Sequence, residues 1–112
     1  MRNARVAVAD QDLEQLSSIF RLLADKTRLS ILMILADGER NVTSLCEVLN
    51  LPQPTVSHHL GLLRIYNVIG NRRQGKQVFY NLSGMLSSQE GTLFQVSVEN
   101  YQIRVRPKAG HS

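Results

Sequence analysis

The sequence is poor in cysteine and in long apolar stretches, and each scarcity excludes a class of protein. Its one cysteine, Cys46, cannot form an internal disulfide, which is typical of a protein kept in a reducing compartment. No apolar run reaches the length that crosses a bilayer, and residues 1–9 hold no apolar stretch of the kind found in export signals. We therefore expect a cytoplasmic protein with no membrane-spanning segment.

Acidic residues are also scarce, but only in the second half of the chain. Residues 51–112 carry two acidic and seven basic side chains, whereas residues 1–50 carry seven acidic and six basic ones. A basic half suits a polyanionic partner such as nucleic acid or an anionic membrane surface, although a solvated basic face would look the same. With 112 residues, of which 43% are hydrophobic and 20% charged, the chain can form one globular domain.

Apolar residues at helical spacing predict two helices in the first third of the chain. The first begins at Asp10 or Asp12, and the second covers residues 26–36 behind an N-cap at Asp25. Because residues 29–35 are apolar almost all round, we expect this second helix at the centre of the core.

Two more helices are predicted close together. A short third helix follows a cap at Thr43 or Ser44 and ends at Asn50. The tight turn 51–54 leads directly into a fourth helix, Pro54–Tyr66, whose early proline is tolerated because the first helical N–H groups lack partners. Two short helices joined so closely are typical of a helix-turn-helix.

A basic β-hairpin follows the fourth helix. Residues 68–73 and 77–82 have the composition of strands, and Gly75 lies in the turn between them. Three cations cluster there: Arg72, Arg73 and Lys76. A helix-turn-helix followed by such a hairpin predicts a winged helix, which is a mainly α fold with a small β wing.

Three motifs in this order resemble the ArsR (arsenic-repressor) family of winged-helix regulators. Residues 23–32 (LADKTRLSIL) are similar to the second helix of that family, residues 53–64 (QPTVSHHLGLLR) to its recognition helix, and residues 74–82 (QGKQVFYNL) to its wing. The likeness runs from about Ile19 to Leu82. It implies a homodimeric repressor that leaves its operator DNA when an inducer binds.

The fourth helix has an apolar face and a polar one. Val56, Leu60 and Leu63 share one face, which we expect to point into the core, and His59 is expected to be a packing residue beside it. The other face starts with short hydrogen-bonding side chains and ends with a cation, which suits a helix in the major groove. With the wing, the residues predicted to contact double-stranded DNA are Gln53, Thr55, Ser57, His58, Arg64, Arg72, Arg73 and Lys76. The wing cations are expected to contact the DNA backbone or the minor groove.

A sensor site is harder to find in the sequence. Arsenic-sensing relatives carry a cysteine pair in the third helix, and the matching positions here are Asn41 and Thr43, so that thiolate site is missing. Cys46 lies further along and is expected to pack in the core, with a redox role as the alternative. We expect no metal site and no cofactor, and the inducer is not identifiable.

The C-terminal segment departs from the family, whose members usually end in a long helix that pairs with its symmetry mate. Residues 92–106 alternate, and a turn at Glu99 and Asn100 would place Val98 opposite Tyr101 on an apolar face. A helix is the rival interpretation, and β-propensity favours the hairpin. In either form the apolar face could be covered by a second subunit.

These observations predict a flexible arm over residues 1–9, a winged-helix DNA-binding domain over 10–84, and an extension with a loose tail over 85–112. The predicted function is that of a homodimeric, sequence-specific transcriptional repressor. No nucleophile–base arrangement supports an enzyme, since Ser57 and His58 are adjacent on one helix with no third group. The alternatives are a protein-interaction module on the same scaffold, and a redox switch that acts through Cys46.

Overall fold

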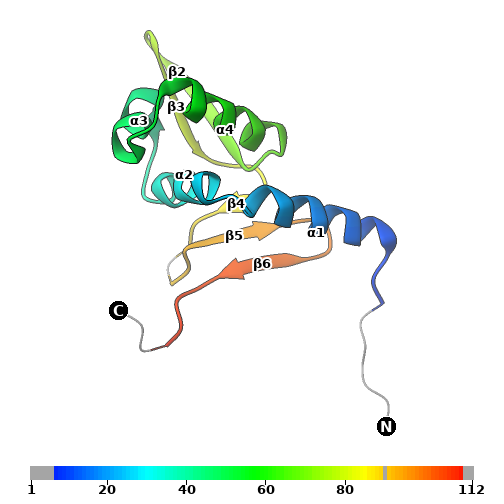
Figure 1. Cartoon of the computed structure of the whole chain (residues 1–112). Coiled ribbons are helices and arrows are strands. Elements are labelled where there is room, and N and C mark those ends of the chain that lie inside the picture. The colour runs from blue at the N-terminus through cyan, green and yellow to red at the C-terminus, as the bar shows by residue number, and fades with distance from the viewer. Residues whose placement is uncertain (1–6, 90, 110–112) are drawn as a thin grey trace.

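The computed structural model describes residues 7–89 and 91–109 and forms four helices and two small sheets (Figure 1). The part of the predicted N-terminal arm before residue 7, and the end of the predicted tail after residue 109, lie outside the described residues. The elements in chain order are α1 Asp10–Leu23, α2 Lys26–Ala36, β1 Arg40–Asn41, α3 Val42–Leu49, α4 Gln53–Ile65, β2 Ile69–Gln74, β3 Gln77–Leu82, β4 Leu86–Ser87, β5 Phe94–Ser97 and β6 Gln102–Val105.

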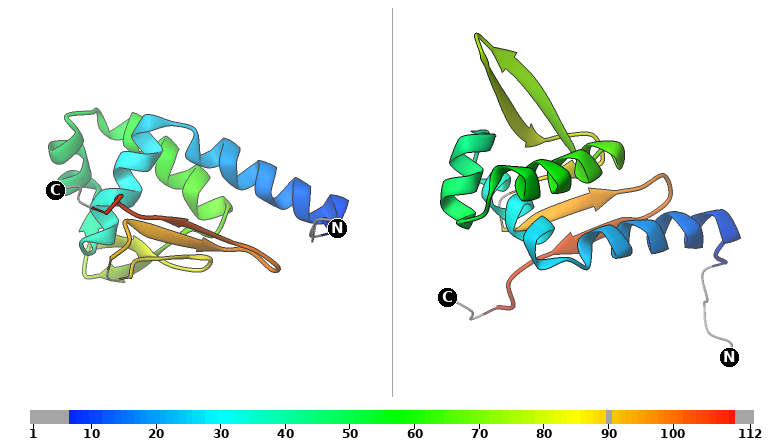
Figure 2. Two further views of the ribbon diagram at one scale, coloured as in Figure 1. Left: turned by 90° about the horizontal axis from the view of Figure 1, so that it is seen from below. Right: turned by 45° about the horizontal axis from the view of Figure 1, so that its top comes forward.

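The predicted winged helix is confirmed. Helix α2 has the predicted bounds, α4 begins and ends one residue earlier than predicted, and β2 and β3 form the wing. The wing projects away from the helices, with its tip far from the C-terminal strands (Figures 1 and 2). Within the described ranges, none of the helices is long and apolar enough to cross a membrane.

The core is built around α2, as its apolar sequence predicted. Ile31 and Leu32 are fully buried and Leu35 nearly so, while the remaining apolar residues of α2 are half-buried against them. On α1 the apolar residues are divided between the core and the surface. Ile19 and Leu23 are buried, but Leu13 and Phe20 are 53% and 54% exposed, because they lie on the face of α1 that turns away from α2.

The first sheet joins the wing to the helices. Its strand order is β1-β3-β2, and all pairs are antiparallel. Thr43 or Ser44 was predicted to cap α3, and this was wrong. Asn41 is the cap, because the chain leaves strand β1 at that residue and its side-chain oxygen accepts a hydrogen bond from the Ser44 N–H at 2.9 Å.

The C-terminal hairpin is also confirmed. Strands β5 and β6 pair in the predicted register, with Phe94 opposite Val105 and Val96 opposite Ile103. The short strand β4 was not predicted, and it makes β5 the central strand of the sheet. Gln95, whose side chain alternates with the apolar ones of β5, is 6% exposed, and it accepts a hydrogen bond from Arg104 Nε at 3.0 Å.

This second sheet shares the core of the winged helix. Leu86, Phe94 and Val96 belong to the same buried cluster as the helix residues. At the turn of the hairpin, Asn100 Nδ2 donates a hydrogen bond to the buried carboxylate of Asp12 in α1 at 3.0 Å. The hairpin is therefore fastened to the first helix. The division between residues 84 and 85 stays a prediction.

Candidate DNA-binding site

Helices α3 and α4 form the helix-turn-helix, and three residues connect them. Asn50, which follows α3, adopts the left-handed conformation (φ 55°, ψ 48°) that asparagine tolerates better than most residues. Leu51 and Pro52 complete the turn, and Pro54 occupies the first turn of α4. Local sequence thus sets the sharp change of direction between the two helices.

Helix α4 is turned as its apolar spacing predicts. Val56, Leu60 and Leu63 are 0–2% exposed and hold the helix against the core. On the opposite side Gln53, Ser57 and Arg64 are exposed. Within residues 7–89 and 91–109, no hydrogen bond or ion pair engages the side chains of Gln53, Thr55, Ser57, His58 or Arg64. The polar face is therefore unengaged and open to a partner.

The 23–32 motif ties the start of α2 to α4. Asp25 caps α2 by accepting a hydrogen bond from the Arg28 backbone N–H at 3.0 Å, and this bond is the main reason that the pKa of Asp25 lies below its usual value. The Arg28 side chain donates from Nε to the Leu22 carbonyl at 2.7 Å, and its Nη1 lies 3.4 Å from His59 Nδ1. His59 is half-buried here, so Arg28 connects the α1–α2 turn to the inner side of α4.

Among the residues that the structure describes, two cations of the wing have no side-chain partner and one is engaged. Its turn contains Gly75, whose φ of 62° favours glycine, and Lys76. Arg73 and Lys76 are exposed, and their side chains make no hydrogen bond or ion pair with the residues that the structure describes. Both cations are available to a phosphate.

Arg72 is held by Glu39, which lies between α2 and β1. Its Nε and Nη2 both lie 2.8 Å from Glu39 Oε1, and Nε is also 3.0 Å from Oε2. Glu39 Oε2 accepts a further hydrogen bond from Asn81 Nδ2 at 3.0 Å. The pKa of Glu39 is lowered, chiefly by the hydrogen bonds from Arg72 and then by the one from Asn81, and the pKa of Arg72 is raised by Glu39. Phosphate contact by Arg72 stays a prediction.

Of the two positions that match the missing cysteine pair, Thr43 is exposed and Asn41 has structural partners. Besides capping α3, Asn41 donates from Nδ2 to Gln77 Oε1 of the wing at 3.1 Å. Cys46 is half-buried and packs against the core. Among the described residues, no three His, Cys, Asp or Glu side chains are placed to hold a metal ion.

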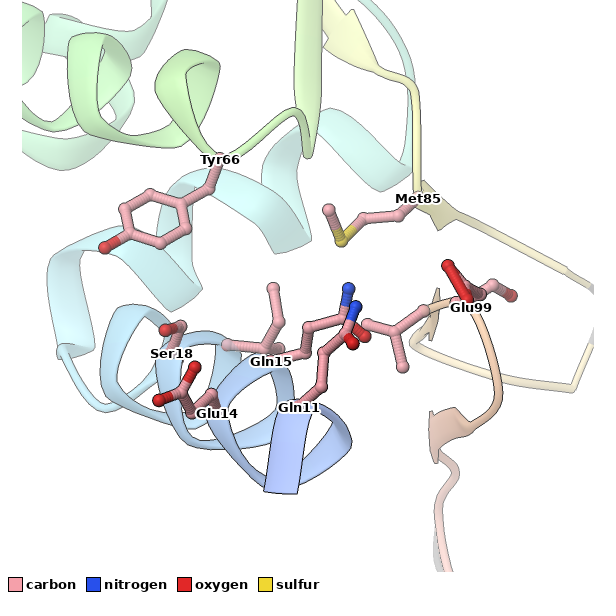
Figure 3. A pocket seen from close by; sticks show the side chains of 10 residues that line it. Gln11, Glu14, Gln15, Ser18, Tyr66, Met85 and Glu99 are labelled. Atoms are coloured by element: carbon pink, nitrogen blue, oxygen red, sulfur yellow. The ribbon is translucent and has the colours of Figure 1, made fainter. Parts of the chain in front are cut away.

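A hollow of about 520 Å³ lies between α1 and the C-terminal sheet, well away from the exposed face of α4 (Figure 3). Gln11, Glu14, Gln15 and Ser18 of α1 form one wall, and Tyr66, Met85 and Glu99 face them. Ile19 and Val98 add apolar surface. This hollow exists only because the hairpin packs beside α1.

Comparison with known proteins agrees with this geometry. The family model described as "Bacterial regulatory protein, arsR family" matches residues 25–68, which hold α2, α3 and α4. The arsenic resistance transcriptional regulator ArsR2 of Pseudomonas putida is 37% identical over 82 residues, or 72% of this chain and 71% of that protein. The chain belongs to the ArsR family.

Two further proteins are similar to this ArsR-family chain. The arsenical resistance operon repressor of Escherichia coli is 47% identical over 66 residues, which are 58% of this chain. The aligned part covers 56% of that repressor, so the chain spans about half the length of this relative. The solution structure of the homodimeric winged helix-turn-helix DNA-binding domain of Mb0332 from Mycobacterium bovis has a TM-score of 0.61 and 29% identity. The match covers 71% of this chain and 77% of that one.

The structure brings most of the predicted residues onto one side of the molecule, since α3, α4 and the wing occupy the same end (Figure 1). Sequence reasoning missed Glu39 and Asn41, the two residues that connect this ArsR-family helix-turn-helix to its wing. Only the pairing of β1 with β3 shows that they lie beside the wing, and two residues of extended chain are too few for a recognisable strand.

Proposed function

We propose that this protein is a sequence-specific DNA-binding transcriptional repressor that acts as a homodimer. The observation that carries the proposal is the open polar face of α4 beside a wing with two unpartnered cations. Membership of the ArsR family and the likeness to a repressor and to a DNA-binding domain support it.

In this proposal α4 enters the major groove. Gln53, Thr55, Ser57 and His58 lie in its first half and are placed to meet base edges, where amide and hydroxyl groups can match the donors and acceptors of the bases. Arg64, near the end of the helix, meets a phosphate. These side chains would select the operator sequence.

The wing supplies affinity more than selectivity. Arg73 and Lys76 contact the DNA backbone or the minor groove, and each neutralised phosphate releases counterions and makes binding sensitive to salt. Arg72 was predicted to act in the same way, but its guanidinium is already paired with Glu39.

The homodimer is proposed to form through the outer face of α1. Leu13 and Phe20 lie seven residues apart on this face, and each exposes more than half of its side chain. Apolar side chains of this size are usually covered by a partner when they gather on one face. A two-fold dimer would present two α4 helices to half-sites about one DNA turn apart, or a multiple of it.

The signal that releases the repressor is unidentified, and we expect the protein in the cytoplasm and without catalytic activity. The cysteine pair of arsenic-sensing relatives is missing here, because Asn41 and Thr43 stand at the matching positions, and a hairpin replaces the terminal helix that the family usually has. A redox role for Cys46 stays an alternative that Cys46→Ser would test through DNA release by peroxide.

The proposal is tested by fluorescence anisotropy with two duplexes, one from upstream of the protein's own gene and one scrambled, each at two salt concentrations. We expect binding to the upstream duplex to be at least ~10³-fold tighter, with a steep loss at the higher salt. A matched pair of variants separates the roles. Ser57→Ala should reduce the preference between duplexes, whereas Lys76→Ala should weaken binding to both equally. Absence of binding even at low salt would contradict the proposal and favour a protein-interaction module.

A further inference from the structure

The feature that stands out beyond the DNA-facing surface is an ion pair that crosses the wing sheet. In the strand order β1-β3-β2, Arg72 lies on the edge strand β2 and Glu39 directly precedes the opposite edge strand β1. The central strand β3 lies between them. The Arg72 side chain therefore reaches across β3 to meet Glu39.

Two residues of the central strand β3 contact the Arg72–Glu39 ion pair. Phe79 lies opposite Arg72 in the β2–β3 register, and the guanidinium carbon is 5.0 Å from the centre of its ring. Two residues further along β3, Asn81 donates to the same Glu39 carboxylate. The contact of the guanidinium with the Phe79 ring and the hydrogen bond from Asn81 strengthen an ion pair in which two guanidinium nitrogens already contact the carboxylate.

All three guanidinium nitrogens of Arg72 already have partners within the protein. Its Nε and Nη2 are engaged by Glu39, and its Nη1 donates to Gln74 Oε1 at 2.8 Å. The charge of the guanidinium is also neutralised by the carboxylate beside it. Arg73 differs in both its hydrogen bonds and its charge environment. Successive side chains of a strand point to opposite faces, and no described residue makes a side-chain hydrogen bond or ion pair with Arg73.

The hairpin needs such support. Beyond the two residue pairs that join β1 to β3, the wing is a two-stranded ribbon, and isolated two-stranded ribbons are only marginally stable in water. Because β1 runs directly into α3, a contact that spans from Glu39 to Arg72 sets the direction of the wing relative to the helix-turn-helix.

We propose that Arg72 is a positioning residue that makes no phosphate contact of its own. Together with Glu39 it forms a cross-sheet brace, which holds the wing in the direction needed for DNA contact. This inference rests on the proposed DNA binding for its effect on affinity, but the brace itself is a property of the free protein.

The first test compares Arg72→Gln with Arg73→Gln by anisotropy over a range of salt concentrations. The two variants remove the same charge from adjacent residues of one strand. We expect Arg73→Gln to reduce the slope of log affinity against log salt by about 0.9, the value for one lost phosphate contact on duplex DNA. Arg72→Gln should weaken binding by about two- to fivefold and leave the slope unchanged. A slope that falls equally in both variants would overturn the proposal.

The second test uses Glu39→Gln, for which the two possible roles of Arg72 predict opposite changes in DNA affinity. If Arg72 contacts a phosphate, releasing it from Glu39 raises affinity. If Arg72 is a brace, Glu39→Gln weakens binding as Arg72→Gln does. The comparison is made at the higher salt, where the long-range effect of removing an acidic charge is screened. An increase in affinity there would refute the brace.

Hydrogen exchange of the free protein separates this inference from the proposed function. We expect Glu39→Gln and Arg72→Gln to speed amide exchange over residues 69–82, and Arg73→Gln to leave it unchanged. If the wild type binds no duplex, the proposed function fails, while exchange still decides whether the brace exists. Equal exchange in all three variants would overturn the brace even if the wild type binds DNA.

Discussion

The orientation of α4 can be tested by removing one buried leucine from it. Leu60 is 2% exposed and lies on the same face as Val56 and Leu63. Leu60→Ala deletes three carbon atoms from a packed site, which costs about 2 kcal/mol of transfer free energy, and the remaining cavity raises the total to about 3 kcal/mol. For a domain of this size that corresponds to a fall in Tm of roughly 10 °C.

The matched control is Ile65→Ala, on the same helix. Ile65 is 77% exposed, so truncating it should change the free energy of unfolding by less than about 0.5 kcal/mol. Both variants are unfolded thermally and with urea while circular dichroism is followed. Protein concentration is kept fixed, because the stability of a dimer depends on it.

Two results would refute the reasoning. If Leu60→Ala cost less than about 1 kcal/mol, or if Ile65→Ala cost as much at every concentration, α4 would have a different rotation about its axis. The side chains proposed to meet base edges would then point elsewhere. Loss of stability in Ile65→Ala that appears only at high concentration, where the subunits associate, would instead place Ile65 at a subunit contact.

Three further predictions concern the dimer, the cap of α3 and pH. Phe20→Asp should convert the dimer into a folded monomer in analytical ultracentrifugation, because it places a charge on the apolar outer face of α1; an unchanged mass would argue against that interface. Asn41→Ala should reduce the free energy of unfolding by about 1 kcal/mol through loss of the α3 cap, whereas Asn41→Asp should retain most of it, and equal loss in both would contradict the capping role. The Arg72 hydrogen bonds hold the pKa of Glu39 below its ordinary value. At pH values above the ordinary pKa this pair therefore contributes its full stabilisation, and the stabilisation is lost as pH falls through the lowered pKa of Glu39. Urea midpoints of the wild type and Glu39→Gln should therefore differ at neutral pH and converge as pH falls through the lowered pKa of Glu39, and a constant difference would contradict the pairing.

The helices, the wing and the C-terminal hairpin were predictable because each is encoded by local patterns. Helical spacing predicted α2 and α4, and the proline and asparagine between α3 and α4 indicated a turn there. Alternation between apolar and polar residues, together with a two-residue turn at Glu99 and Asn100, was enough to predict the register of β5 and β6.

The outward face of α4 was predicted from the same periodicity, since whatever does not face the core must face outward, and its contact with DNA stays a prediction that the family resemblance supports. For the wing, composition alone was insufficient. Arg72, Arg73 and Lys76 look equivalent in the sequence as three neighbouring cations. Their environments differ only because Glu39, 33 positions away from Arg72, is brought beside one of them.

The sequence by itself determined the four helices, the strands of the wing and of the C-terminal hairpin, and the apolar face of α4, since these depend on residues within a few positions of one another. The tertiary structure alone decided that β1 pairs with β3, that Gln95 is buried, that Leu13 and Phe20 remain exposed, and that Arg72 is paired. Each of these depends on contacts between residues far apart in the chain. Such contacts follow from how the elements pack together, and no local pattern records that arrangement.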